Sequence, residues 1–464
     1  MKAISRAERT KEDSIWALMK EVDLGVEHGK NCDTFTNPCD GGPNTSRANC
    51  AAHRSIAAPP LKFFSHQKRA KQGPSEPIRL PQKPFSAIGD VQKRKNYDTT
   101  QKQAFAYAFT RKTLRTKEDI LSFYINRAIE ELREQLETTN TVDMVPIFGN
   151  ALLDLSCKLT VDRDLGAINP HGTTHPCLEV IHQASRYLYI PVQMLRLPRI
   201  ISYPIQLFRR FLAKGIFLID PFRVLAKKRV QHGGADNDFV SYMTFEKGGK
   251  KSVEKIINNT AVIIAASAET TTSWLCASMY YALINPLVLS KPRSEIRSAA
   301  QDVSDLNLDL LYSMTYLKAC MEESIRIYPP VTGTFTRMVP KGGSHICGKH
   351  IPENTVVGVH QWATYHNANN FKHPDDFRPE RWFDGNNEYA NDRRNALQPF
   401  SYGPRKCIGN ELATMNAKLF FARLLWEFDI ELEPTSCDWA NQKGHTLPYR
   451  QPLWVKVKRR NVKD

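Results

Sequence analysis

The chain has 464 residues, of which 41% are hydrophobic and 24% are charged, a mixture that excludes a fibrous or wholly disordered protein. The net charge of +16 predicts a basic face that suits an acidic protein, a nucleic acid or an anionic membrane. The ten cysteines form no dense framework and follow no secretory leader, so we expect reduced thiols. No apolar run approaches the roughly 18 residues of a spanning helix, and we therefore expect no transmembrane anchor in this sequence.

The first ninety residues differ in composition from the rest. A short helix is predicted around residues 14–22, and residues 25–84 are rich in Asn, Gly, Pro, Ser and Lys, which favours an atypical, poorly ordered basic arm over residues 1–90. Zinc or nucleic-acid binding by this arm is disfavoured, because its Cys and His residues lack the paired spacing of structural zinc sites and no nucleic-acid-binding motif follows its basic residues. Its four potential zinc ligands are Cys32, Cys39, Cys50 and His53.

From about Tyr97 onward the pattern is helical. Apolar residues at three- and four-residue spacing predict helices over residues 104–109 and 117–137. A longer helix over residues 253–285 ends before Pro286, and about 30 residues at 1.5 Å each make a rod of ~45 Å. These elements predict a mainly α fold with small β-sheets, in which residues 91–464 form one domain. The predicted strands lie at residues 344–346, 355–360 and 453–457, and a helix follows Gly409.

The most specific stretch runs from Phe400 to Gly409 and reads FSYGPRKCIG. Cys407 lies between Gly403 and Gly409, ahead of a predicted helix whose positive end would lower the pKa of a thiol and make it a durable metal ligand. The glycines permit tight turns and close approach of a flat cofactor, Arg405 can reach a carboxylate, and Phe400 can shield the sulfur from water. The alternative, a buried cysteine without a ligand, is disfavoured by the rest of the motif.

This stretch resembles the cysteine loop of the cytochrome P450 monooxygenases, and further motifs occur in the order expected for that family. Residues 323–326, ESIR, match E-x-x-R, in which the two charged side chains share one helix face. Residues 377–382, FRPERW, match the F-x-P-E-R-W segment. The resemblance implies that Arg381 completes an ion triad with Glu323 and Arg326, which holds the segment leading to the cysteine loop.

Residues 266–270, ASAET, resemble the A-G-x-[DE]-T motif on the long helix that passes over the haem in this family. Glu269 and Thr270 retain the acid and the alcohol of the motif, and the resemblance implies that they deliver protons in order during oxygen activation. Ser267 lies where glycine is usual. We expect its hydroxyl to substitute in part for that of Thr270. Taken alone, such a run would more often be an exposed helix patch.

Two weaker matches concern the propionate groups of haem. Arg337 matches an arginine that contacts a propionate in many family members. Upstream, the family's W- or H-x-x-x-R pattern aligns with Asp98 and Lys102, so the cation is retained and the aromatic partner is lost. The resemblance covers residues 97–458, whereas residues 1–84 do not resemble the membrane anchor and first β-sheet that the family usually has.

The resemblance implies a P450 fold and haem-thiolate monooxygenation, in which one oxygen atom of O2 enters a hydrophobic small molecule. Residues 361–366, QWATYH, are similar to fungal members of secondary metabolism, which implies a terpenoid or polyketide substrate. Cys407 would be the proximal ligand of haem b. The further cofactor contacts implied are Phe400, Gly403, Arg405, Gly409, Arg337 and Lys102.

Electrons are expected to come from NADPH through a separate NADPH-cytochrome P450 reductase, because the chain contains no Gly-rich dinucleotide fingerprint. The basic charge suits docking of an acidic flavoprotein. We expect a monomer that binds no nucleic acid. The family is usually anchored to the endoplasmic reticulum membrane and faces the cytoplasm, and without a spanning segment this chain is expected to be cytoplasmic or peripheral to the membrane.

Two alternatives belong to different classes. One is a P450-fold enzyme that rearranges or dehydrates its substrate without reductase and O2, which the retention of Glu269 and Thr270 disfavours. NADPH dependence of turnover discriminates this alternative. The other is an inactive haem-binding relic, which the aberrant arm, Ser267 and Asp98 favour, and which a carbon monoxide difference spectrum tests.

Overall fold

The structure is a computed structural model that describes residues 106–169, 172–182, 220–233, 238–244, 253–346, 348–444 and 447–460. All of these residues belong to the unit of the chain formed by residues 50–464. The predicted arm with its helix, its potential zinc ligands and Lys102 lie outside the described residues.

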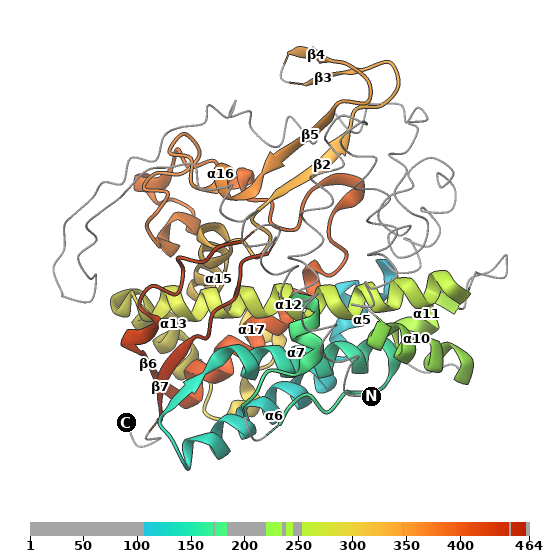
Figure 1. Ribbon diagram of the computed structural model, residues 1–464. Helices are drawn as coiled ribbons and strands as arrows, with labels where there is room; N and C mark the ends of the chain where they lie inside the picture. The colour runs from blue at the N-terminus through green and yellow to red at the C-terminus, as the bar shows by residue number, and fades with distance from the viewer. Residues whose placement is uncertain are drawn as a thin grey trace, which may run out of the picture. The chain divides into compact units, whose positions relative to one another are not determined.

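The predicted mainly α fold with small β-sheets is confirmed (Figure 1). The helices are α5 (Arg111–Arg115), α6 (Glu118–Leu136), α7 (Met144–Val161), α10 (Asp220–His232), α11 (Phe239–Thr244), α12 (Val253–Leu283), α13 (Pro286–Ala299), α14 (Leu308–Ser313), α15 (Thr315–Ile327), α16 (Gln361–Tyr365) and α17 (Asn410–Glu427). The strands are β1 (Thr141–Asp143), β2 (Thr334–Met338), β3 (Ser344–Ile346), β4 (Lys349–Ile351), β5 (Val356–His360), β6 (Phe428–Leu432) and β7 (Trp454–Arg459). A helical turn at 176–182 and short 3₁₀ segments, including Pro379–Trp382 and Gly403–Arg405, complete the set.

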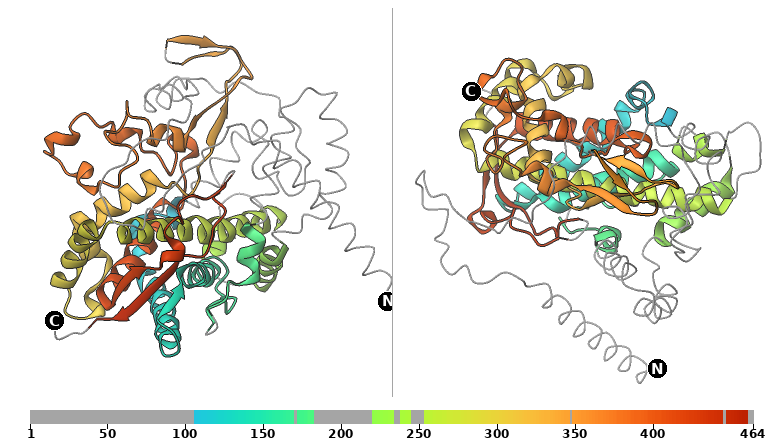
Figure 2. Two further views of the ribbon diagram at one scale, coloured as in Figure 1. Left: turned by 60° about the vertical axis from the view of Figure 1, so that its left-hand side comes forward. Right: turned by 90° about the horizontal axis from the view of Figure 1, so that it is seen from above.

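The 31-residue helix α12 has α6 and α7 on one side and the β2–β5 pair on the other (Figures 1 and 2). It contacts α7, α10, α15 and α17, so the longest predicted helix is the one around which the core is built. Its predicted end was two residues too late, because Asn285 is the N-cap of α13 and Pro286 its first residue. Proline suits that position, since its missing N–H would have no helical acceptor there.

Helix α7 is the one described helix that is long and apolar enough to cross a membrane by length and composition, and 94% of it is buried inside the protein. It lies against both α6 and α12. Asp143 caps its start by accepting the N–H of Val145 at 3.0 Å. Asp154 and Lys158 interrupt the apolar residues of this helix. Asp154 is fully buried and accepts the N–H groups of Leu165 and Ile168 at 2.9 and 3.0 Å.

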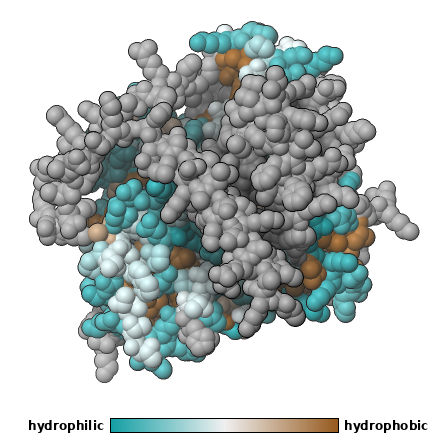
Figure 3. All heavy atoms as spheres, in the orientation of Figure 1, coloured by the Kyte–Doolittle hydropathy of each residue, from teal (hydrophilic) through white to brown (hydrophobic). Residues whose placement is uncertain are grey.

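The described strands form three antiparallel sheets, in the orders β1-β7-β6, β2-β5 and β3-β4. The predicted strand at 344–346 is confirmed, whereas those at 355–360 and 453–457 each begin one residue later than predicted. Gly358 of β5 is required where β2 approaches it, because a Cβ atom there would lie 2.9 Å from the carbonyl oxygen of Phe335 and closer still to the side chain of Thr334. On the face shown in Figure 3, the described surface is mostly hydrophilic with small separate apolar patches, as is usual for a folded protein.

Glu131 of α6 is a carboxyl group that the fold buries with incomplete hydrogen bonding. It is 3% exposed, one oxygen accepts from Gln135 at 3.2 Å, and the other oxygen has no partner among the described residues. Burial, with a contribution from the charge of Glu134, raises the pKa of Glu131 to about 8. A raised pKa means that the folded chain binds this proton more tightly than the unfolded chain does, so the stability it contributes is present at low pH and is lost as pH rises towards 8.

We therefore expect Glu131→Gln to raise the free energy of unfolding by about 1 to 3 kcal/mol at high pH, because the amide avoids a buried charge. The gain should shrink as the pH falls to about 5, where the folded wild-type carboxyl is neutral. Urea unfolding across this pH range measures the difference. Glu137→Gln, at the exposed end of the same helix, is the control. A gain that is equal at all pH values would contradict the prediction.

Candidate active site

The cysteine loop lies between the 3₁₀ segment Gly403–Arg405 and α17, which begins three residues after Cys407. Cys407 is exposed and its N–H donates to the carbonyl oxygen of Phe400 at 2.7 Å. Gly403 has a φ of 77° and Ser401 a φ of 60°, both in the left-handed region. The loop thus closes on itself and presents a thiol just ahead of a helix.

The electrostatics of the Cys407 thiol differ from our expectation. Desolvation by the surrounding protein raises its pKa, and the N–H of Gly409 and the charge of Lys406 act in the opposite direction without overcoming it. The prediction that the helix end lowers the pKa of Cys407 was therefore wrong for the protein chain alone. The dipole of α17 falls off within its first turn, and α17 starts at Asn410 rather than at the cysteine.

The surroundings of Cys407 include open space and an aromatic contact to the central helix. Among the described residues, a Cβ atom on Gly409 would have the Sγ atom of Cys407, at 3.9 Å, as its one neighbour within 4 Å. Phe400 is half-buried and its ring meets that of Trp274 edge to face, with ring centroids 6.0 Å apart. Trp274 is one turn beyond Thr270 on α12, so the two residues share a face of that helix. The Cys407 loop is therefore tied to the face of α12 that carries Thr270.

Arg337 of β2 brings a positive charge to the same loop. It donates from Nη2 to the Ser401 hydroxyl at 3.1 Å and from Nη1 to the carbonyl oxygen of Thr336 at 2.8 Å, while its buried Nε has no hydrogen-bond partner among the described residues. Burial and the nearby charge of Arg405 lower the pKa of Arg337. The repulsion between the charges of Arg337 and Arg405 is relieved when an anion neutralises them, so the arrangement suits a carboxylate ligand.

The side chains of Glu269 and Thr270 on α12 point in different directions. Thr270 is half-buried and its hydroxyl donates to the carbonyl oxygen of Ala266, an exposed residue, at 2.8 Å. Glu269 is 1% exposed. One face of α12 is therefore open at Ala266 and Thr270, while the neighbouring carboxylate is enclosed.

The carboxylate of Glu269 contacts two basic side chains that our sequence analysis missed. Oε2 accepts from Nη2 of Arg450 at 2.9 Å, and Oε1 lies 3.3 Å from Nδ1 of His182. Burial alone would raise the pKa of Glu269, but the charge of Arg450 and the hydrogen bond and charge of His182 outweigh it and lower the pKa. The group is held as a carboxylate inside the protein.

Ser267 lies against α7 and not beside Thr270. Its hydroxyl makes a close hydrogen bond with that of Ser156 in α7 and donates to the carbonyl oxygen of Ile264 at 3.2 Å. The expectation that it substitutes for the Thr270 hydroxyl does not fit these contacts. The Ser267 side chain instead joins α12 to α7.

The structure brings the three charged residues of the predicted triad together, all 0% exposed. Arg326 binds Glu323 in bidentate fashion, from Nε at 2.9 Å and from Nη2 at 2.8 Å. Arg381 donates from Nε to Oε1 of Glu323 at 2.9 Å. The indole N–H of Trp382 donates to Oε2 at 2.9 Å and the backbone N–H of Arg378 to Oε1 at 3.0 Å. The carboxylate therefore receives five hydrogen bonds, which compensate its burial.

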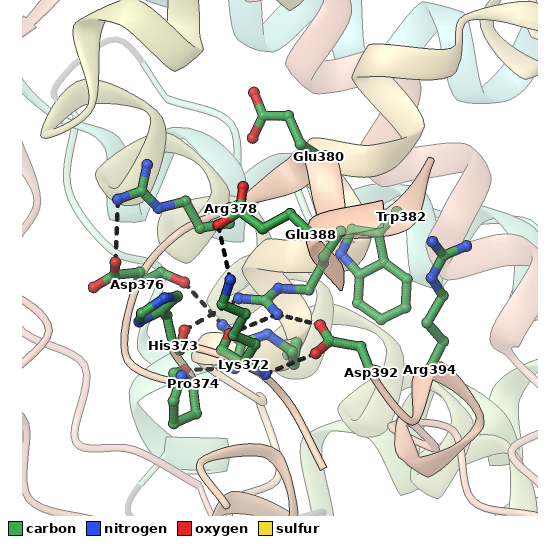
Figure 4. A network of polar contacts seen from close by, with 12 residues as sticks. Lys372, His373, Pro374, Asp376, Arg378, Glu380, Trp382, Glu388, Asp392 and Arg394 are labelled. Atoms are coloured by element: carbon green, nitrogen blue, oxygen red, sulfur yellow. Dashed lines mark hydrogen bonds and ion pairs between the residues drawn. The ribbon is translucent and has the colours of Figure 1, made fainter. Parts of the chain in front are cut away.

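Asp392 is a further member of this network that the motifs did not reveal. It forms a close ion pair with Arg381. Other N–H groups of Arg326 and Arg381 donate to the carbonyl oxygens of residues 365, 372, 373, 374 and 376. Figure 4 shows the surroundings of Asp392, including the contacts of Lys372 with Glu388 and of Arg378 with Asp376. The ion triad thus anchors the loop between α16 and the segment Pro379–Trp382.

Comparison with known proteins decides the family. The cytochrome P450 family model matches residues 64–456. The chain belongs to the cytochrome P450 family. Membership implies a haem-thiolate centre. Within the described residues, the exposed Cys407 thiol, the open space beside Gly409 and the buried, unpartnered Nε of Arg337 fit such a group.

The P450 chain is similar to fungal enzymes of secondary metabolism. It is 34% identical to cytochrome P450 monooxygenase astJ of Aspergillus oryzae over 377 residues, which are 78% of this chain and 74% of the relative. It is 31% identical to a trichothecene C-15 hydroxylase of Fusarium sporotrichioides over 365 residues, 77% of this chain and 74% of the relative. An averantin hydroxylase of Dothistroma septosporum is 29% identical over 83% of this chain and 74% of its own length. These relatives identify the chain as an oxidoreductase of the monooxygenase type.

Proposed function

We propose that this P450 inserts one oxygen atom of O2 into a terpenoid or polyketide intermediate of fungal secondary metabolism. Electrons come from NADPH through a separate NADPH-cytochrome P450 reductase, and the net charge of +16 favours an acidic partner of that kind. The observation that carries the proposal is the exposed Cys407 thiol ahead of α17, tied through Phe400 to the face of α12 that bears Thr270. The hydroxylases among the relatives support the substrate class.

The residues of the cysteine loop and β2 are proposed to hold haem b. Cys407 is the proximal ligand, Gly403 and Gly409 shape the loop, Phe400 covers the sulfur, and Arg337 and Arg405 hold the propionates. Lys102, outside the described residues, is the further propionate contact. Haem bound through a thiolate supplies oxygen activation, because the thiolate donates electron density that favours O–O cleavage. We also propose residues 91–464 as the catalytic domain and 1–90 as an arm, whose last part the family match from residue 64 overlaps.

Thr270 and Glu269 are proposed to manage protons. The Thr270 hydroxyl gives its own hydrogen to the carbonyl oxygen of Ala266, so the lone pairs of Oγ1 can hold a water molecule on the open face of α12. Glu269, the preceding residue, is a carboxylate because its pKa is lowered. Although the two side chains point in different directions, the carboxylate and the hydroxyl are proposed to supply protons singly and in order through water.

We expect Thr270→Ala to lower the product formed per NADPH consumed by roughly tenfold, because protons then reach oxygen in the wrong order and peroxide is released. Thr270→Ser, which keeps a hydroxyl, should restore most of the coupling. Product, NADPH and peroxide are measured with a reconstituted reductase and a substrate identified by spectral titration of terpenoids and polyketides.

Ser267→Ala is the matched control, since its hydroxyl binds Ser156. It should lower stability without changing coupling, and the double variant should uncouple no more than Thr270→Ala does. Unchanged coupling in Thr270→Ala would contradict the proton role. Turnover without NADPH would favour the rearranging enzyme, and absence of a thiolate carbon monoxide spectrum in the wild type would favour the haem-binding relic.

A further inference from the structure

The β3–β4 hairpin carries two histidines that face each other across its strands. The hairpin extends beyond the β2–β5 pair, on the side away from α12 (Figure 1). His345 lies opposite His350 in the register of the two strands, and both residues are exposed. Their rings meet edge to face, with centroids 5.3 Å apart. The proposed oxygen chemistry does not use either residue.

The strand pairing places the two side chains on one face of the hairpin. Two residues join β3 to β4, so the pair next to the turn, Ile346 and Lys349, is the hydrogen-bonded one. His345 and His350 then form a pair without hydrogen bonds between them, whose Cβ atoms lie roughly 4.5 to 5.5 Å apart. The register therefore keeps the two imidazoles side by side.

The backbone before β3 leaves room for the His350 ring. Gly343 has a φ of 75°, and a Cβ atom there would lie 2.5 Å from Nε2 of His350 and 2.9 Å from the carbonyl oxygen of Ile351. The neighbouring Gly342 donates its N–H to the carboxylate of Glu353 at 2.8 Å. A glycine turn thus accommodates one imidazole, and the nearby carboxylate is bound to the backbone of that turn.

The separation of the rings matches that of two imidazoles on one tetrahedral metal ion. A Zn–N bond of about 2.0 to 2.1 Å and a ring centre about 1.1 Å behind the nitrogen put each centre ~3.2 Å from the ion. Two such centres at the tetrahedral angle are ~5.2 Å apart, and those of His345 and His350 are 5.3 Å apart. The right angle of a square-planar site would bring them to ~4.5 Å. Rotation about the Cβ–Cγ bond turns a ring nitrogen towards the ion and leaves the ring centre in place.

We propose that His345 and His350 form a zinc site on the β3–β4 hairpin, in which each imidazole supplies one nitrogen and water completes the coordination. Imidazole is a common ligand of Zn²⁺, and the tetrahedral spacing favours Zn²⁺ over Cu²⁺, which prefers a square-planar arrangement. Within the described residues, no group of three or more His, Cys, Asp and Glu side chains could hold a metal ion, so the remaining positions fall to water. Bound zinc would join the two strands of the hairpin.

The first test measures zinc binding by the purified full chain after a chelator has removed loosely bound metal. Titration calorimetry gives the affinity, and X-ray absorption at the zinc edge identifies the ligands. We expect His345→Gln and His350→Gln each to weaken the binding of one zinc ion at least about tenfold. The wild-type spectrum should show two imidazoles at about 2.0 Å. His232→Gln, at the exposed end of α10, is the matched control and should bind zinc as the wild type does.

Cys347 separates the two histidines in the sequence and lies outside the described residues. A thiolate is also a zinc ligand, so Cys347→Ser is a necessary variant. It should keep the wild-type affinity and both imidazoles. Loss of zinc from Cys347→Ser, or sulfur scattering in the wild type that disappears in this variant, would overturn the two-imidazole site. Equal affinities of the wild type and both histidine variants would overturn it as well.

The second test follows the hairpin itself by amide hydrogen exchange of residues 344–351, with and without zinc. Each strand has three residues, so the hairpin opens easily unless a ligand joins the strands. Saturating zinc should slow exchange at least about tenfold in the wild type and leave His345→Gln unchanged. Exchange that ignores zinc in the wild type, or that slows equally in His345→Gln, would contradict the proposal. Neither test requires turnover, so its result is separate from that of the proposed function.

Discussion

Replacement of Cys407 by alanine is expected to abolish the thiolate-specific absorption of the reduced carbon monoxide complex. Among the six described cysteines, Cys157, Cys276 and Cys320 are buried, Cys177 and Cys437 are half-buried, and Cys407 alone is exposed. It also has open space beside it at Gly409. Cys157, Cys276 and Cys320 cannot take its place, because they are enclosed in the core of the protein.

The measurement is the difference spectrum of the reduced protein with and without carbon monoxide, together with haem content. Cys437→Ala is the control and should keep the full signal. Because Cys407 is exposed, its replacement should change the stability of the haem-free chain by no more than about 0.5 kcal/mol. Survival of the signal in Cys407→Ala, with its loss in Cys437→Ala or Cys347→Ala, would show that another cysteine binds the iron.

Glu323→Gln is expected to prevent folding or haem retention. The change leaves Arg326 and Arg381 facing each other at 0% exposure without the carboxylate that both of them bind. An uncompensated buried charge of this kind costs about 3 to 5 kcal/mol, a large part of the stability of a typical domain. An amide also cannot accept the five hydrogen bonds that the carboxylate receives.

The yield of folded, haem-loaded protein and its urea unfolding midpoint measure this effect. Glu322→Gln is a closely matched control, because Glu322 precedes Glu323 on α15 and is half-buried with one long contact to Lys318 at 3.9 Å. We expect a change within about 1 kcal/mol for that control. A normal yield and midpoint for Glu323→Gln would mean that the triad contributes little to folding.

The sequence predicts the helical framework well because periodicity is a local property. Helix α12 and strand β3 appear within two residues of their predicted bounds. The pairing of Glu323 with Arg326 also follows from their spacing on one helix. The contact of Asp392 with Arg381 could not be predicted in this way, because it depends on how the loop after Pro379–Trp382 folds back.

The partners of Glu269 could not be predicted from the sequence either, because they are brought to it by the tertiary fold. His182 lies 87 residues before it and Arg450 181 residues after it, and neither belongs to a motif. The orientation of Ser267 towards Ser156, 111 residues away, likewise depends on how α12 packs on α7. The direction of the Cys407 pKa shift required the balance between desolvation and the helix end, which the residue pattern does not contain.

Trp274 links the packing of two helices to the cysteine loop. Its indole N–H donates to the carbonyl oxygen of Met321 and the hydroxyl of Ser324 in α15, about 50 residues later in the chain, at 3.1 Å each. Its ring contacts that of Phe400 in the cysteine loop. The shape of the cysteine loop therefore depends on the contact between α12 and α15, and haem retention is expected to report whether that contact is intact.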